Sequence, residues 1–256
     1  MHNKQRSVIV SLNVERSNYD EAVSFVIARA IQENSAYICV ANTHMVMEAH
    51  DNPTFRDIVN SADLIVPDGM PLVWGLKLLN VPDVERVYGP ALTIRLCEEA
   101  ERQTIPVGFF GGEVETLAKL KDKLLRRFPR IRIAYMFSPP FRELSRQEDD
   151  QIVAEIKSSG TRILFVGLGC PKQEQWMATH CRKLNTVMLG VGAAFDFLAG
   201  TKPQAPRWMQ VTGLEWAFRL TTEPKRLWRR YLLNNPRFLY LFAKQLLVEK
   251  LRWYLH

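Results

Sequence analysis

Asp68 is the side chain of this sequence whose position points most directly to acid–base chemistry. It stands between Pro67 and Gly69, directly after a short apolar run that is typical of a β-strand. A carboxylate at the end of a strand can act as a general base or accept a hydrogen bond from a sugar hydroxyl. It can equally form an Asx-type turn before the next helix. The residues alone leave these three roles open.

Other polar and glycine-containing segments also follow predicted strands. Gly111 and Gly112 join a strand to a helix whose N-terminus could hold a phosphate, although a turn that needs positive φ would have the same sequence. Gly169 precedes Lys172 at the start of another helix, and Lys172 could hold a diphosphate or lie in solvent. Further candidate ligand-binding residues are Asn42, Thr43, Gly69, Gln173, Gly192 and Asp196.

The sequence lacks the common motifs for ATP, dinucleotides and metal ions. Neither GxxxxGK[ST] nor a full GxGxxG is present, which disfavours P-loop NTPases and dehydrogenases. There is no DxD element to hold a metal-bound nucleotide diphosphate. The four cysteines show no metal spacing, and His44 and His50 do not share a helix face. We therefore expect no metal ion and no cofactor.

The elements that position these residues alternate between strands and helices. Apolar, β-branched runs predict strands at 7–14, 36–41, 64–67, 106–110, 132–135, 162–167 and 186–190. Helical patterns between them cover 20–32, 44–60, 70–79, 91–103, 114–128, 145–158 and 172–181. This order predicts an α/β fold with a mostly parallel sheet and helices on both faces. Ligands of such sheets bind at the carboxyl ends of the strands, where five candidate segments converge.

The pattern changes after Gly200. Strand signals end, the proline-rich segment 201–206 follows, and helical pieces are separated by Gly213, Pro224 and Pro236. We therefore expect a catalytic body at residues 1–200 and a helical appendage at residues 201–256.

The positive charge of the chain lies in this appendage. The 256 residues carry a net charge of +7, but residues 201–256 alone hold eleven basic and three acidic residues, a net charge of +8. The body is therefore nearly neutral. With 47% hydrophobic and 24% charged residues, the composition is that of a folded globular protein, and the asymmetry indicates an anionic partner for the appendage.

Three anionic partners fit a basic segment that is rich in tryptophan. They are nucleic acid, a membrane interface, and an anionic ligand covered by a helical cap; simple packing on the body is a fourth explanation. The four tryptophans and the apolar stretch 238–247 favour a membrane over nucleic acid. The tryptophans are Trp208, Trp216, Trp228 and Trp253.

The expected location follows from two further patterns. No segment is long and apolar enough to span a bilayer, and the N-terminus lacks the apolar core of a signal peptide. We expect a cytoplasmic protein that is attached peripherally to the inner face of the cell membrane and that self-associates when it is off the membrane.

Five motifs in order resemble the WecG/TagA/CpsF family of bacterial glycosyltransferases over roughly residues 8 to 235. They are AN(T)…MEA, ADLIVPDGMPLVWG, FFGG, GLGCPKQEQWM and GVGAAFDFLAGTKPQAPRWMQVTGLEWAFRLTTEPKRLWRRY. The resemblance implies a Rossmann-like core with an appendage that docks on the membrane. It also implies inverting, metal-independent transfer of a sugar from a UDP-sugar to a polyprenyl-diphosphate-linked sugar. The donor sugar could be N-acetylmannosamine, its uronic acid or glucose, and the product teichoic acid, common antigen, capsule or exopolysaccharide.

The resemblance also assigns roles to particular residues. The catalytic aspartate falls on Asp68 as general base, and the glutamine of the PKQ motif falls on Gln173 in the donor or acceptor pocket. Three appendage arginines would stabilise negative charge on the departing diphosphate; these are Arg219, Arg226 and Arg229. The sequence departs from the family at Val40, where threonine is common, although Asn42 is retained and Thr43 is close.

One alternative belongs to a different class. A non-catalytic module that binds nucleotide sugars or nucleic acid would share the strand-end glycines and the basic appendage. Retention on anionic liposomes compared with single-stranded nucleic acid distinguishes the two hypotheses.

Overall fold

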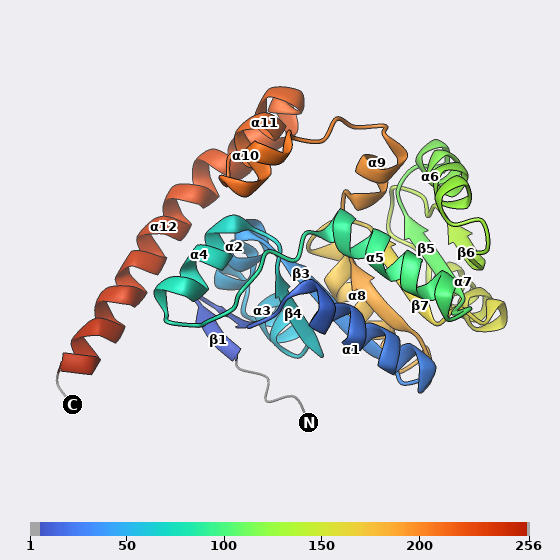
Figure 1. The fold of residues 1–256 in the computed structure, drawn as a ribbon, viewed down its shortest axis with the longest axis horizontal. Coiled ribbons are helices and arrows are strands. Elements are labelled where there is room, and N and C mark those ends of the chain that lie inside the picture. The colour runs from blue at the N-terminus through green and yellow to red at the C-terminus, as the bar shows by residue number, and fades with distance from the viewer. Residues whose placement is uncertain (1–5, 255–256) are drawn as a thin grey trace.

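The computed structural model describes residues 6–254 and confirms the predicted α/β fold (Figure 1). Its strands are β1 (Arg6–Ile9), β2 (Leu12–Glu15), β3 (Ala36–Ala41), β4 (Leu64–Pro67), β5 (Val107–Gly111), β6 (Ile133–Phe137), β7 (Ile163–Gly167) and β8 (Val187–Gly190). Its helices are α1 (Tyr19–Ile31), α2 (Thr43–Asp51), α3 (Pro53–Asn60), α4 (Met70–Leu78), α5 (Gly89–Arg102), α6 (Val114–Arg127), α7 (Arg146–Ser159), α8 (Lys172–His180), α9 (Ala194–Ala199), α10 (Arg207–Val211), α11 (Glu215–Thr222) and α12 (Pro224–Tyr254).

The main sheet has six parallel strands in the order β4-β3-β8-β7-β5-β6. Strand β8, the last along the chain, lies between β3 and β7, with Ile38 opposite Leu189 and Leu189 opposite Phe165. Because all the strands run in one direction, their carboxyl ends share one edge, and the loops that carry the candidate residues meet there.

Both faces of the sheet are covered by helices, because successive strand residues point to opposite sides. In β3, Ile38 and Val40 pack into a cluster with α1, α5, α6 and α9. Tyr37, Cys39 and Ala41 pack into a second cluster with α2, α3, α7 and α8, which also receives Phe residues of α12. This double burial accounts for the nearly continuous apolar strands in the sequence.

Two predicted elements are wrong in detail. The strand predicted at 7–14 is the antiparallel hairpin β1–β2, in a separate two-stranded sheet, because Val10 turns the chain with φ of 58°. The helix predicted at 44–60 breaks into α2 and α3 at Asn52. The Asn52 side chain accepts a hydrogen bond from Phe55 N and caps a helix that begins at Pro53, where the missing N–H costs nothing.

Three helices lie in the part of the appendage that the structure describes, residues 201–254. Gly213 separates α10 from α11, and Pro224 begins α12, as the sequence suggests, but Pro236 lies inside one continuous helix of 31 residues. Proline removes the hydrogen bond to the carbonyl four residues earlier. Here that residue is Leu232, which lies on the exposed side of the helix.

The long helix α12 runs back along the body beside α2 and α4 (Figure 1). Its inner face buries Leu227, Tyr231, Phe238 and Phe242. Arg237 forms a two-pronged ion pair with Asp51 at the end of α2. Within residues 6–254, no helix is long and apolar enough to cross a membrane.

Candidate active site

A pocket lies where the ends of β3 and β4 meet the appendage. The body contributes Asn42, Thr43, Asp68, Gly69 and Arg86, and the appendage contributes residues from the α10–α11 turn, α11 and α12. The walls of the pocket therefore come from both parts of the chain.

Asp68 lies at the floor of this pocket. Its backbone N–H and that of Gly69 both donate to the carbonyl of Ala41, at 2.8 and 3.2 Å, and so fix the start of the turn after β4. The side chain is 19% exposed. The pKa of Asp68 is raised to about 6, because burial and nearby Glu215 raise it by more than Arg86 and Arg219 lower it. A carboxyl group of this kind is ionised at neutral pH and basic enough to take a proton.

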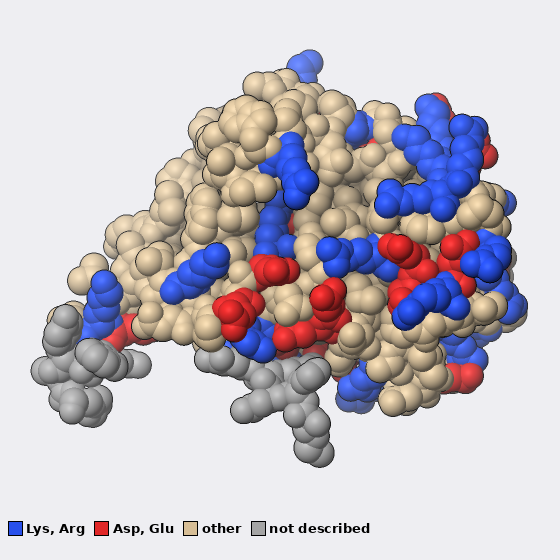
Figure 2. Space-filling model, in the orientation of Figure 1, with Lys and Arg blue, Asp and Glu red and all other residues tan. Residues whose placement is uncertain are grey.

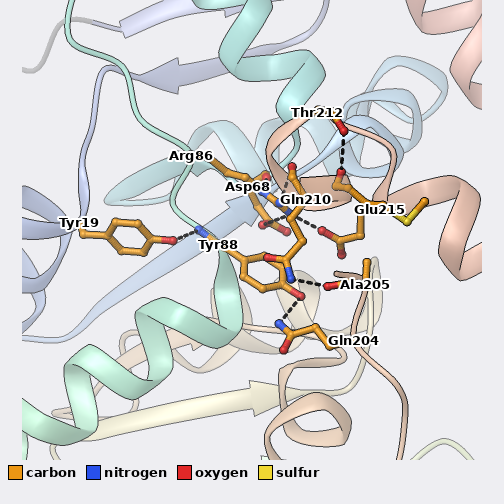
Figure 3. Close-up of polar contacts among 10 residues, drawn as sticks. Tyr19, Asp68, Arg86, Tyr88, Gln204, Ala205, Gln210, Thr212 and Glu215 are labelled. Atoms are coloured by element: carbon orange, nitrogen blue, oxygen red, sulfur yellow. Dashed lines mark hydrogen bonds and ion pairs between the residues drawn. The ribbon is translucent and has the colours of Figure 1, made fainter. Parts of the chain in front are cut away.

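Arg86 links the Asp68 turn to the appendage (Figure 3). Its Nη2 donates to Glu215 at 2.6 Å and lies 3.4 Å from Asp68 Oδ1. Its Nε donates to the backbone carbonyl of Asp68, and its Nη1 donates to the carbonyl of Gln210 at 3.2 Å. The guanidinium also lies over the ring of Tyr88, 4.3 Å from the ring centre. The pairing of Arg86 with two carboxylates raises its pKa, so it stays charged.

Tyr88 extends this network toward the α9–α10 connection. Its hydroxyl accepts a hydrogen bond from Gln204, and its backbone N–H donates to the Tyr19 hydroxyl, both at 3.0 Å. Gln210 donates to the carbonyl of Ala205 at 2.7 Å. Figure 3 shows these side chains converging from the body and the appendage.

Two arginines of the appendage line the pocket, and only one of them was predicted. Arg219 does so, as expected, together with Arg230. Among the described residues, the buried Nε atoms of both have no hydrogen-bond partner, and burial lowers the pKa of Arg230. Two guanidinium groups with unused donors favour a dianionic ligand.

Arg226 and Arg229 point elsewhere. Arg226 pairs with Glu223 one turn earlier, and Arg229 lies over the ring of Trp228 at 5.7 Å; neither lines the pocket. The sequence contained a signal for Arg230, which follows buried Leu227 by three residues and so faces the same side of the helix.

His44 is a second pocket residue to which sequence reasoning assigned no role. Its Nδ1 lies 3.4 Å from Asn234 Nδ2 on α12. Burial and the charge of Arg230 lower the pKa of His44 to about 3, so the ring is neutral and Nδ1 can accept this hydrogen bond. His44 thus joins the start of α2 to the appendage. No cluster of metal-binding side chains occurs among the described residues.

Asn42 and Gln173 have their oxygen atoms engaged by the backbone. The Asn42 oxygen caps α2 by accepting from the N–H groups of His44 and Met45. Gln173 is buried, and its oxygen accepts from Gly169 and Gly192, each at 3.2 Å. Its Nε2 donates to Glu174 at 2.7 Å. Gln173 therefore ties two glycine turns together and does not line the pocket.

The other predicted residues lie farther along the same edge. Gly111 has φ of 115°, and a Cβ there would lie 2.6 Å from the Gly167 carbonyl, so the close approach of β5 and β7 requires glycine. Gly112 follows it with φ of 71°. Asp196 on α9 pairs with Lys202 at 2.9 Å, and Lys172 is exposed at the start of α8. None of these residues lines the Asp68 pocket.

The outer surface of the appendage is largely apolar. Figure 2 shows few charged side chains over α10, α11 and the adjoining part of α12. The large exposed side chains there include Trp208, Val211, Trp228, Leu232, Leu233, Leu239 and Tyr240. The side chain of Trp253 lies outside those that the structure describes. Apolar patches of this kind mark interaction surfaces.

Comparison with known proteins gives a consistent result. The model of the glycosyl transferase WecG/TagA/CpsF family matches residues 7–252. A protein of Bacillus spizizenii named N-acetylglucosaminyldiphosphoundecaprenol N-acetyl-beta-D-mannosaminyltransferase is 33% identical over 81% of this chain and 78% of its own length. A Staphylococcus aureus protein of the same name is 32% identical over 82% of this chain and 81% of its own length.

Proposed function

The chain belongs to the WecG/TagA/CpsF family of glycosyltransferases, and from this premise we propose that it transfers N-acetylmannosamine from a UDP-sugar to N-acetylglucosamine on a polyprenyl diphosphate. The names of its relatives support this acceptor and sugar. The product would be a precursor of a cell-envelope polysaccharide.

Asp68 acts as general base in this proposal. The acceptor hydroxyl gives its proton to the Asp68 carboxylate as its oxygen bonds to the anomeric carbon, and the bond to the diphosphate breaks with its electrons leaving on UDP. One displacement inverts the anomeric centre, so an α-linked donor gives the β linkage that the relatives' name contains. The observation that carries the proposal is the Asp68 carboxyl group, with a pKa of about 6, in a pocket closed by arginines.

Arg219 and Arg230 stabilise the departing diphosphate. Their guanidinium groups supply the positive charge that a metal ion supplies in other transferases. Their buried Nε atoms have no hydrogen-bond partner among the described residues and can donate to the ligand. Groups that are oriented before the reaction stabilise developing charge without a reorganisation cost.

The membrane brings the acceptor to this pocket. The apolar outer surface of the appendage and its net charge of +8 are suited to the interface of an anionic bilayer, with tryptophan and leucine inserted and basic side chains at the headgroups. We expect peripheral attachment at the cytoplasmic face.

The test of the reaction is a donor screen with a short-chain lipid-diphosphate N-acetylglucosamine acceptor, read by mass spectrometry. Addition of one N-acetylhexosamine from UDP-N-acetylmannosamine, lost in Asp68→Asn, is the expected result. Transfer of a different sugar would overturn the donor assignment, and full activity of Asp68→Asn would overturn the base assignment.

The test of membrane attachment is sedimentation with anionic vesicles. The double substitution Leu232→Asp and Leu233→Asp should reduce binding at least tenfold, whereas Leu125→Asp, at an exposed leucine of α6, should not. Preferential binding of the unsubstituted chain to single-stranded nucleic acid would favour the nucleic-acid-binding alternative.

A further inference from the structure

We propose that Glu215 is a positioning residue for the transfer reaction: it takes the shorter contact of the Arg86 guanidinium, which keeps the pairing of Arg86 with the Asp68 carboxylate weak and leaves the base able to accept a proton from the acceptor hydroxyl when the appendage is seated on the body. This inference rests on the proposed function of Asp68. The appendage would then contribute the carboxylate of Glu215 to the site, in addition to its arginines.

The hydrogen bonds of Arg86 show the competition between the two carboxylates. Its Nη2 lies 2.6 Å from Glu215 and 3.4 Å from Asp68 Oδ1, and the longer distance is near the limit of a hydrogen bond. Its Nε donates to the backbone carbonyl of Asp68 and not to the side chain. Glu215 therefore has the short contact with a donor that pairs with the base only at the longer distance.

The appendage holds Arg86 at a second point. Its Nη1 donates to the carbonyl of Gln210, and both Gln210 and Glu215 lie beyond the proline-rich connection. Without them, the nearest anion for the guanidinium is Asp68. An arginine and a carboxylate readily form a paired, two-bond contact, which would occupy both oxygens of the base and weaken it.

Burial makes these charges interact strongly. The side chains of Asp68, Arg86 and Glu215 are 19%, 16% and 15% exposed, so water screens them poorly. The titratable and charged groups that act on Asp68 come from α1, the segment before α5, and α11; they are Tyr19, Arg86, Tyr88, Glu215 and Arg219. After burial, the charge of Glu215 helps to keep the pKa of Asp68 raised, against Arg86 and Arg219.

A purely structural role for Glu215 would have a different signature. If the Arg86–Glu215 pair only fastened the appendage to the body, its loss would lower stability or the overall rate. The pH at which the base titrates would then stay where it is. The pH profile therefore separates the two roles.

The experiment is Glu215→Gln in the full chain, with transfer from UDP-N-acetylmannosamine measured between pH 4.5 and 9. We expect the acidic limb, near pH 6 in the unsubstituted enzyme, to move about 0.5–1 unit lower because removal of a neighbouring negative charge lowers the pKa of Asp68. The rate above the limb should fall by up to about three- to tenfold, because closer pairing with Arg86 makes Asp68 a weaker base. The matched control is Glu249→Gln, an exposed appendage carboxylate that contacts Gln245.

A second readout needs no substrate. Asp68 can be titrated by ¹³C NMR of carboxyl-labelled aspartate, with its signal identified by its loss in Asp68→Asn. A lower pKa in Glu215→Gln supports the inference, and an unchanged pKa, or a lower rate with an unmoved acidic limb, overturns it. Failure of the proposed function has its own signature, which is retained transfer by Asp68→Asn.

Discussion

The raised pKa of Asp68 makes a prediction about stability that requires no knowledge of the substrate. A carboxyl group whose pKa is about 6 in the folded protein, against 3.8 ordinarily, binds its proton more tightly when folded. Its ionised form therefore opposes folding at neutral pH. Replacement with a neutral group of similar shape should remove this cost, so Asp68→Asn should be an inactive but more stable protein.

The magnitude follows from the shift of about 2 pH units. At about 1.4 kcal/mol per unit, ionisation of Asp68 costs about 3 kcal/mol above pH 6, and this net value includes the attraction of Arg86 and Arg219. For a chain of this size, the gain corresponds to a rise in Tm of roughly 6–12 °C. Arg86 keeps Glu215 as its partner in the variant, so the substitution leaves no unpaired guanidinium.

The gain in stability of Asp68→Asn should depend on pH. The destabilising contribution of the Asp68 carboxyl group is absent well below pH 3.8, where the group is protonated in both states, grows between about pH 4 and pH 6, and is complete above that range. The difference in stability between Asp68→Asn and the unsubstituted chain should therefore be small at pH 4 and full at pH 8. Thermal unfolding followed by circular dichroism across this range measures it.

The control is Asp122→Asn, an aspartate of α6 that is 70% exposed, which should change Tm little at either pH. Two results would show that the ionised Asp68 carboxylate does not destabilise the folded protein. One is that Asp68→Asn is no more stable than the unsubstituted chain at pH 8, and the other is that the gain in stability is the same at pH 4 and pH 8. The reasoning that assigns Asp68 as the base would then lose its physical support.

Three further predictions concern the rest of the site. Arg230→Ala should lower kcat about 100-fold and Arg226→Ala far less, measured by steady-state kinetics; equal losses would contradict the placement of Arg230 in the pocket. Gly111→Ala should cost at least about 2 kcal/mol in urea unfolding because its Cβ meets a carbonyl, whereas Gly160→Ala, with open space around its Cβ, should cost about 1 kcal/mol; similar losses would argue against this close approach. Gln173→Glu places a second carboxyl group beside the buried Glu174, whose pKa is raised to about 7, so this substitution should lower Tm more at pH 8 than at pH 5.5. A decrease in Tm that does not depend on pH would argue against the buried position of residue 173 beside Glu174.

The sheet was largely predictable from local patterns. The strands at 36–41 and 64–67 were predicted with their observed bounds, because strands buried on both faces leave unbroken apolar runs. The errors at Val10 and Asn52 arose where one residue changes the chain direction. The signal at Asn52 was present, since asparagine before proline is a typical helix start.

The site was only partly predictable, because its network joins segments that are distant in the sequence. Asp68 stood out at a strand end, but no local pattern connects Arg86 with Glu215, which lie 129 residues apart. Gln173 was expected in the pocket on its motif alone, whereas its side chain is used to hold two turns. Its role in the reaction and those of Arg226 and Arg229 stay predictions.

The central position of β8 has a consequence for synthesis of the chain. Because this strand pairs with both β3 and β7, neither half of the sheet can close on the other until residues 187–190 have left the ribosome. Until then, two strand edges stay open to wrong pairing. The appendage emerges after this closing strand, so the strands of the sheet are all synthesised before helices α10, α11 and α12.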